Sequence, residues 1–71
     1  MYAQEIAKMI LEKVKNDNRK RIEITLEEIM LKYNCGIVTA RHVLKILQLL
    51  LKENKIDFEY ERGGKLIIKN D

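Results

Sequence analysis

The sequence predicts a small α+β domain, and three observations support this fold class. Apolar residues recur at helical spacing in three stretches, residues 56–61 alternate strictly between apolar and acidic, and a Gly-Gly pair separates them from a second apolar run. The 71 residues are 46% hydrophobic and 35% charged, which is typical of one folded domain. We therefore expect residues 1–71 to form a single domain. Because so small a core contributes little net stability, oligomerisation is a reasonable expectation.

The first predicted helix covers residues 2–17 and is more apolar than one core face requires. Its core stripe holds Ala3, Ile6, Ile10 and Val14, and the charged residues away from the stripe are Glu5, Lys8, Glu12 and Lys15. Tyr2, Met9 and Leu11 are apolar but lie off this stripe. A polar loop follows and ends in the basic cluster Arg19-Lys20-Arg21.

A very short strand and a second helix are predicted next. Residues 22–24 alternate as Ile-Glu-Ile. Thr25 is placed to cap a helix, and Glu28 three residues later completes a capping box. This helix is predicted to run to about Tyr33, and its buried side consists of Leu26, Ile29, Met30 and Tyr33.

The third predicted helix has a buried side and a basic side. Residues 34–36, Asn-Cys-Gly, interrupt the preceding helix because Asn and Gly tolerate left-handed backbone. Thr39 is predicted to cap the next helix, which runs to about Asn54. At about 100° per residue, its core stripe is centred near Leu47, with Ala40, Val43, Leu44, Leu50 and Leu51 on its flanks. The opposite side carries Arg41, Lys45, Gln48 and Lys52, with Val38 near its start.

The C-terminal segment predicts a β-hairpin. Ile56, Phe58 and Tyr60 are expected to point inward, whereas Asp57, Glu59 and Glu61 point outward. Gly63-Gly64 marks the tip of the hairpin, and Leu66 to Lys69 form the return strand.

This order of elements is that of a winged helix: a three-helix helix-turn-helix core with a short β-strand and a C-terminal two-stranded wing. Residues 33–47, YNCGIVTARHVLKIL, resemble the helix-turn-helix of GntR-type regulators, in which a Tyr-Gly-Val-Ser-x-x-Thr-Val-Arg-x-x-Leu pattern recurs. Tyr33, Thr39, Arg41 and Leu44 occupy comparable places, although the turn has Cys35-Gly36 rather than Gly-Val-Ser. The segment ERGGKLIIK is similar to the Arg-Gly-Gly wings of those families. Compact winged-helix regulators of archaea and of their viruses and plasmids are similar in size.

The resemblance implies a double-stranded DNA-binding transcriptional regulator, with the third helix (about 38–54) in the major groove and the wing (about 61–66) on the backbone or minor groove. Residues 38–55 hold four basic residues against one acidic residue, although the whole chain carries only +3. Arginine and lysine can read guanine or contact phosphate. The expected DNA contacts are therefore Thr39, Arg41, His42, Lys45, Gln48, Arg62 and Lys65. The alternative for the third helix is a solvated helix face. The basic cluster 19–21 is expected either to clamp phosphate or to keep a loop solvated.

Surplus apolar residues predict a homodimer. Ile46 and Leu49 lie outside the core stripe of the third helix, as Tyr2, Met9 and Leu11 do on the first, and unexplained apolar surface often marks an interface. The alternative is that the wing strands cover Ile46 and Leu49. A second function class also remains open: a winged helix used for protein–protein contact in a larger assembly, which the acidic outward residues of 57–61 would suit.

Other classes are disfavoured. The sequence has no paired-carboxylate cleft, nucleophile–base pair or phosphate loop, so no enzyme, cofactor or small-molecule substrate is expected. One cysteine (Cys35) and one histidine (His42) are too few for a zinc site. RNA modules use an aromatic stacking platform that is missing here. No membrane partner is expected, and an intracellular, cytoplasmic, nucleoid-associated protein is the simple inference. With no obvious effector pocket, we expect control by protein abundance.

Overall fold

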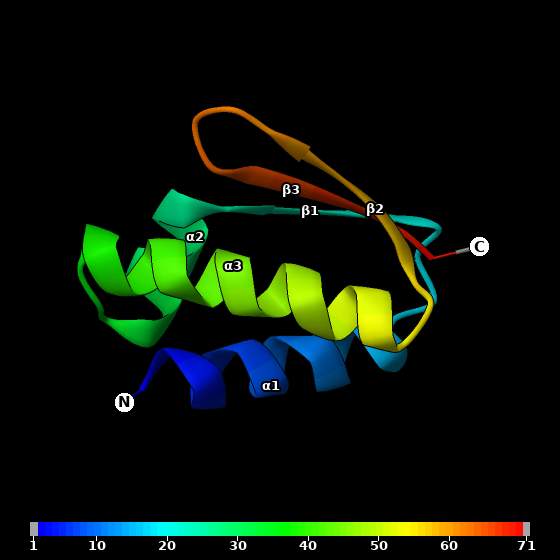
Figure 1. Cartoon of the computed structure of the whole chain (residues 1–71), viewed down its shortest axis with the longest axis horizontal. Coiled ribbons are helices and arrows are strands. Elements are labelled where there is room, and N and C mark those ends of the chain that lie inside the picture. Colours follow the sequence, from blue (N-terminus) through cyan, green and yellow to red (C-terminus); the bar gives the residue numbers. More distant parts are fainter. Residues whose placement is uncertain (1, 71) are drawn as a thin grey trace.

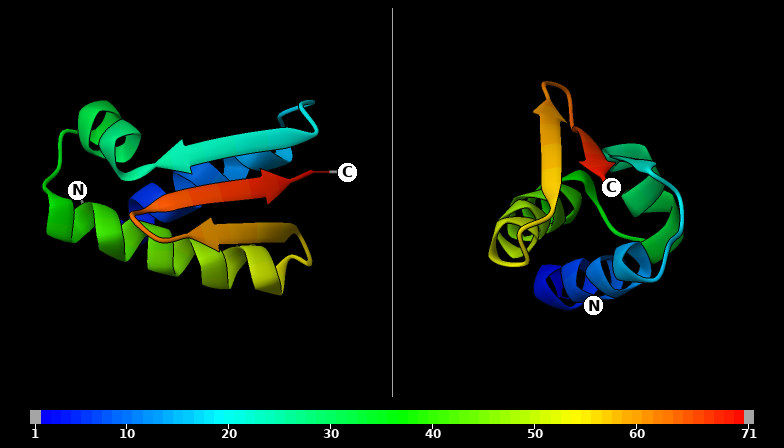
Figure 2. Two further views of the ribbon diagram at one scale, coloured as in Figure 1. Left: turned by 90° about the horizontal axis from the view of Figure 1, so that it is seen from above. Right: turned by 90° about the vertical axis from the view of Figure 1, so that its right-hand side faces the viewer.

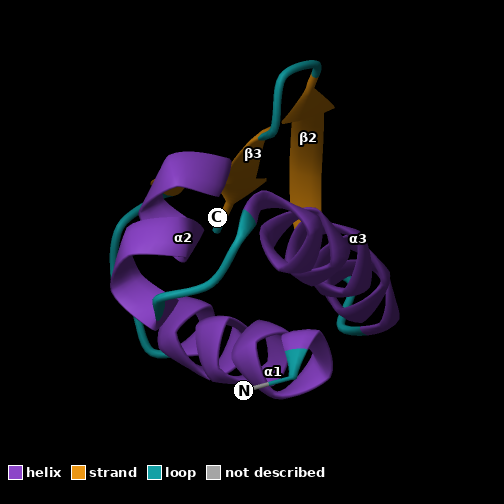
Figure 3. Ribbon diagram, turned by 90° about the vertical axis from the view of Figure 1, so that its left-hand side faces the viewer, coloured by secondary structure: helices purple, strands orange, loops and turns teal. Residues whose placement is uncertain are grey.

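In the computed structural model, which describes residues 2–70, a sheet covers one side of a group of helices (Figure 1). Within these residues the elements are α1 (Ala3–Lys15), β1 (Arg21–Thr25), α2 (Leu26–Tyr33), α3 (Ile37–Glu53), β2 (Asp57–Glu61) and β3 (Lys65–Lys69). The three helices lie on one side of the sheet: α3 lies beneath β2 and packs against α1, and α2 follows β1 and packs against α3 (Figures 2 and 3). This is the winged-helix arrangement that the sequence predicts.

The sheet is antiparallel with β3 in the middle, in the order β1-β3-β2 (Figure 2). Ile68 stands opposite both Ile22 and Phe58, so the three strands present one apolar face to the helices. Strand side chains alternate between the two faces, and the other face is therefore the charged one. The hairpin of β2 and β3 is the wing.

The core is aliphatic, and no polar or charged side chain among residues 2–70 is buried in it. Its members come from one side of each helix and from the inner face of the sheet, as the periodicity predicts. The core residues are Ile6, Ala7, Ile10, Leu11, Val14, Ile22, Leu26, Ile29, Ala40, Val43, Leu44, Leu47, Leu51, Leu66 and Ile68.

The cap predicted at Thr25 is confirmed. Its hydroxyl accepts a hydrogen bond from the backbone N–H of Glu28 at 3.2 Å, which satisfies one of the free amides at the start of α2. The hydroxyl also donates to the Glu28 carboxylate at 3.4 Å. Because Thr25 is the last residue of β1 as well, strand and helix join without a linker.

Three predictions about individual residues are wrong. Leu11 is only 7% exposed, because the buried arc of α1 is wider than the predicted stripe and includes Ala7 and Leu11. Tyr60 lies on the inner side of β2 in register with Leu66 but is 47% exposed, because this end of the wing projects past α3 (Figure 3). Thr39 does not cap α3, which begins at Ile37 with Gly36 at the cap position.

Candidate nucleic-acid interface

The helix-turn-helix is made by α2, the turn 34–36 and α3. Asn34 ends α2 in the left-handed conformation (φ 50°), which Asn tolerates better than most residues. The Cys35 amide then donates to the Met30 carbonyl at 3.2 Å and closes the end of α2. Gly36 is extended, and its carbonyl accepts from the Ala40 amide at 3.0 Å, which starts α3. These bonds hold α3 at a defined position relative to α2.

One side of α3 faces away from the other helices (Figure 3). Arg41, His42 and Lys45 are exposed there, and Lys52 lies on the same side about two turns after Lys45. Val38 is 66% exposed and Leu49 is 61% exposed, so the outer surface of α3 mixes cations with aliphatic groups. We call these residues, Val38, Arg41, His42, Lys45, Leu49 and Lys52, the α3 outer face.

The cations of the α3 outer face have no carboxylate partner among residues 2–70. Every ion pair in this part of the chain belongs to the sheet or to the loop before it, and none involves Arg41, Lys45 or Lys52. An unpaired, solvated cation keeps its full charge available for an external anion. The α3 outer face is therefore free to contact a polyanion.

Thr39 and Gln48 are placed less favourably than the sequence suggests. Both are half-buried, Thr39 in the first turn of α3 and Gln48 in its middle. A shallow hollow on α3 is lined by His42, Lys45, Ile46, Gln48, Leu49 and Lys52. Gln48 therefore borders the outer face rather than standing on it.

The wing tip is held against the start of α2. Gly63 and Gly64 both have positive φ (93° and 91°), which glycine adopts without strain. The Leu26 amide donates to the Gly64 carbonyl at 3.0 Å. A Cβ on Gly64 would lie 2.2 Å from Leu26 Cδ1, whereas a Cβ on Gly63 meets nothing within 4 Å. Only glycine lets the wing and α2 approach this closely.

The two predicted wing cations differ in their surroundings. Arg62 is exposed in the turn and forms no ion pair with any described residue. The Lys65 ammonium lies 3.0 Å from the Glu23 carboxylate on β1. This contact lowers the pKa of Glu23 and raises that of Lys65, since each charge favours the other.

The basic cluster 19–21 is largely neutralised by its neighbours. Arg19 pairs with Asp17 at 2.7 Å, a contact that lowers the pKa of Asp17, and Arg21 pairs with Glu23 at 3.3 Å. Lys20 alone of the three has no ion pair among residues 2–70. This arrangement favours a solvated loop over a phosphate clamp.

The acidic residues of β2 lie on the face of the sheet that points away from the helices. Phe58 packs against the core, and Asp57, Glu59 and Glu61 alternate with it on the opposite side. Glu59 pairs with Lys69, and this contact lowers the pKa of Glu59. The carboxylates thus lie on a different face of the domain from the α3 outer face.

The apolar residues predicted for a dimer do not form one exposed set. Leu11 is in the core, and Ile46 is half-buried and packs against the core. Tyr2 and Met9 are exposed on or beside α1, and Leu49 is exposed on α3. The core therefore accounts for part of the Ile46 side chain, whereas Leu49 stays exposed.

Within residues 2–70 no three or more His, Cys, Asp or Glu side chains gather as a metal site would require. No helix of this part of the chain is long and apolar enough to span a bilayer.

The fold and this geometry define a winged-helix protein. The chain matches no protein-family model and none of the curated proteins. Among solved structures it is similar to the DNA-binding winged-helix protein F-112 of Sulfolobus spindle-shaped virus 1, with a TM-score of 0.74 and 12% identity. The match covers 100% of this chain and 99% of that one. At this identity the likeness demonstrates the shared fold alone.

Proposed function

We propose that this protein binds double-stranded DNA through the α3 outer face and acts as a transcriptional regulator. The observation that carries the proposal is the set of unpaired cations Arg41, Lys45 and Lys52 on the exposed side of the second helix of a helix-turn-helix. The similar viral protein is described as DNA-binding, which supports the same function here.

The roles follow from position along α3. The N-terminal half of a recognition helix reaches base edges, so Val38, Arg41, His42 and Lys45 are the proposed base-reading residues. Arginine can donate two hydrogen bonds to guanine, and an aliphatic side chain such as Val38 can pack on a thymine methyl group. Lys52, near the C-terminal end, is proposed to contact phosphate.

In the wing, Arg62 is the stronger proposed contact and Lys65 the weaker one. Lys65 must give up its contact with Glu23 to bind a phosphate, whereas Arg62 has no ion pair to lose within the described residues. The exposed ring of Tyr60 lies two residues before Arg62 and joins the proposed wing surface. The alternation of residues 56–61 predicts an inward-facing Tyr60, and it gives no indication that the ring is exposed.

We also propose that two copies of the chain form a dimer, through a smaller surface than the sequence predicts. Leu49 follows Lys45 by four residues and so lies on the same side of α3, where a dimer would cover the cations. Exposed residues on and beside α1, Tyr2 and Met9, do not have this conflict. We therefore propose α1, rather than α3, for a dimer that still binds DNA.

The test is fluorescence anisotropy with labelled duplex DNA, comparing wild type with Arg41→Ala, Lys45→Ala and the control Lys8→Ala. Lys8 is exposed on α1 and unpaired among residues 2–70, so it matches Lys45 in charge but not in position. Each lost phosphate contact should reduce the salt slope of log K by about 0.9, and loss of a base contact should weaken binding by about 1–3 kcal/mol. Equal effects of all three variants, or no binding by folded protein at low salt, would sink the proposal.

A protein–protein module is the second candidate function, and the exposed Val38 and Leu49 favour it. Under this reading Leu49→Ser abolishes partner binding while Arg41→Ala and Lys45→Ala leave it unchanged. The anisotropy measurement above separates the two, since only the DNA proposal predicts a loss with the cation variants.

A further inference from the structure

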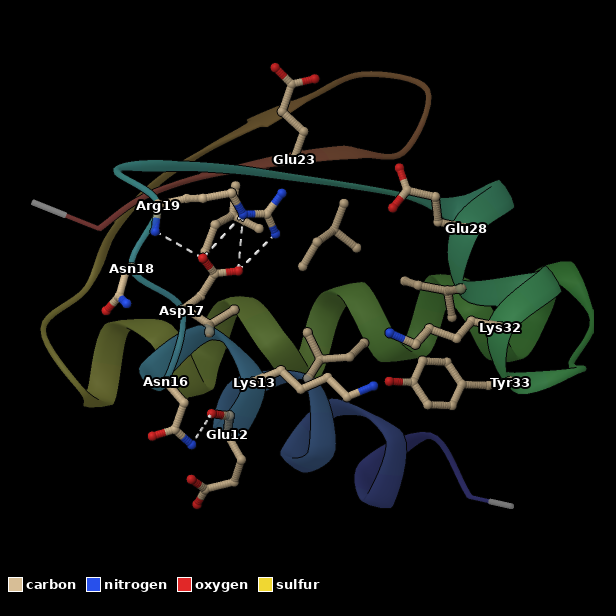
Figure 4. A pocket seen from close by; sticks show the side chains of 15 residues that line it. Glu12, Lys13, Asn16, Asp17, Asn18, Arg19, Glu23, Glu28, Lys32 and Tyr33 are labelled. Atoms are coloured by element: carbon tan, nitrogen blue, oxygen red, sulfur yellow. Dashed lines mark hydrogen bonds and ion pairs between the residues drawn. The ribbon is translucent and has the colours of Figure 1, made fainter.

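A second concave site lies on α1, the loop after it, β1 and α2. The groove has a volume of about 950 Å³, within the range of small-molecule sites. Its floor is aliphatic and consists of Ile10, Val14, Ile22, Ile24 and Ile29. Polar side chains form its rim (Figure 4). No residue of α3 lines it, so it is distinct from the α3 outer face.

Two lysines from different helices converge at one end of this groove. The Lys13 ammonium on α1 lies 5.8 Å from the centre of the Tyr33 ring, and the Lys32 ammonium on α2 lies 6.0 Å from it. Figure 4 shows both ammonium groups pointing toward the hydroxyl end of Tyr33. Neither forms an ion pair within residues 2–70.

The two charges repel each other. Contact with the Lys13 ammonium, and then its positive charge, hold the pKa of Lys32 below its ordinary value. An anion placed between the two lysines would remove this repulsion and gain charge-assisted hydrogen bonds from both. The pair is therefore prepared for a negative group that none of residues 2–70 provides.

The Tyr33 hydroxyl is a third polar group without a partner at the same place. It is buried, and no hydrogen-bond partner for it exists among residues 2–70. Buried hydroxyls are nearly always hydrogen-bonded, because an unpaired one loses its contacts with water and gains nothing. A ligand oxygen between the lysines would also provide an acceptor for this hydroxyl.

We propose that this groove binds a small amphipathic anion, with a carboxylate or phosphate head held by Lys13, Lys32 and the Tyr33 hydroxyl and an apolar body on the isoleucine floor. The remainder of the rim argues against a polyanion such as DNA. Glu12 and Glu28 also line the groove, and neither is neutralised by an ion pair within residues 2–70. A single compact anion meets only the lysine end, whereas a phosphate backbone would run past the carboxylates.

This site is missing from the sequence-based expectations, which included no effector pocket. Lys13 and Lys32 are 19 positions apart, and each is an ordinary charged residue of an amphipathic helix. The convergence exists only because the C-terminal half of α1 and the end of α2 come together on the same side of the sheet. The inference does not depend on DNA binding.

The test is binding of four probes by ¹H–¹⁵N chemical-shift titration of the full chain. Phenyl phosphate and phenylacetate carry the head and the apolar body, inorganic phosphate carries a head alone, and benzyl alcohol carries a body alone. The proposal expects one or both aromatic anions to bind at least about tenfold more tightly than inorganic phosphate or benzyl alcohol, with shifts concentrated in residues 10–33. Comparing the affinities of phenyl phosphate and phenylacetate distinguishes a phosphate site from a carboxylate site.

Three variants assign the head group's contacts. Lys13→Gln and Lys32→Gln should each weaken binding by about tenfold or more, as expected for a lost charge-assisted hydrogen bond. Lys8→Gln, on α1 but outside the groove, should leave it unchanged. Tyr33→Phe should weaken binding while the free protein keeps its thermal stability, because only an unpaired hydroxyl is removed. Because the two lysines are exposed, circular dichroism should show native folding for both glutamine variants.

Two results would overturn the proposal. One is the absence of saturable binding of either aromatic anion by folded wild-type protein. The other is a loss of DNA affinity in Lys13→Gln and Lys32→Gln as large as that in Lys45→Ala, with no loss of small-anion binding. That pattern would assign the lysine pair to a DNA surface.

Discussion

Replacing Gly64 by alanine tests whether the wing is held in place by its contact with α2. The new Cβ would lie 2.2 Å from Leu26 Cδ1 and 2.4 Å from Leu26 Cγ, far inside ordinary contact distance. Leu26 is a core residue and its amide donates to the Gly64 carbonyl, so neither side can move away freely. Gly63→Ala is a matched control, because Gly63 has nearly the same positive φ but open space around it.

The magnitudes follow from two separate costs. A non-glycine residue held at positive φ loses about 1–2 kcal/mol, and this cost applies to both variants. Overpacking a well-packed site costs about 1–3 kcal/mol more, and this applies to Gly64→Ala alone. We therefore expect about 1–2 kcal/mol of destabilisation for Gly63→Ala and about 2–5 kcal/mol for Gly64→Ala. For a domain of this size each kcal/mol shifts Tm by roughly 4–8 °C.

The assay is urea or thermal unfolding followed by circular dichroism, with Leu26→Ala as a second background. Removing the Leu26 side chain beyond Cβ takes away the atoms at 2.2 and 2.4 Å, so Gly64→Ala in that background should cost only the strain, about 1–2 kcal/mol. If Gly63→Ala and Gly64→Ala destabilise equally in the wild-type background, the contact between wing and α2 does not contribute and the reasoning fails.

Three further predictions concern stability. Leu11→Ala should cost about 2–5 kcal/mol, because Leu11 is 7% exposed, whereas Met9→Ala, at 42% exposure, should cost less than about 1 kcal/mol in chemical unfolding. Thr25→Ala should cost about 1 kcal/mol through loss of the α2 cap, and Thr25→Ser should keep most of it in the same assay. Hydrogen bonds from Lys65 hold the pKa of Glu23 below 4.5, so its stabilising contribution is present above pH 4.5 and is lost as pH falls below that value. Thermal unfolding of Glu23→Gln across this range should therefore show a smaller acid-induced loss of Tm than wild type; an unchanged loss would contradict this.

The parts of the fold that depend on local chemistry were predictable from particular residues. Thr25 caps α2, Asn34 ends it in the left-handed conformation, and Gly63-Gly64 turns the wing. Each of these effects acts over a few neighbouring residues, which a single sequence displays directly. The basic side of α3 was predictable for a similar reason, since the helical period alone separates Arg41 and Lys45 from the core stripe.

Residues whose environment depends on distant elements were not predictable in this way. Alternation assigns Tyr60 to one face of its strand, but whether α3 extends far enough to cover it depends on how wing and helix are positioned. Leu11 lies off the narrow stripe, and it is buried because the arc of α1 covered by its neighbours is wider than that stripe. The availability of a charged side chain is equally hard to predict. The sequence suggests that Lys65 is a free wing cation, but in the fold the Glu23 carboxylate on β1 lies 3.0 Å from its ammonium.

Periodicity, capping residues and turn residues were thus enough to specify the winged-helix class and the side of α3 that faces solvent, because these signals act between residues close in the chain. The availability of each cation, the close approach of Gly64 to Leu26 and the lysine pair over Tyr33 arose only when separate elements packed together. Such contacts depend on three-dimensional distances that no local pattern encodes.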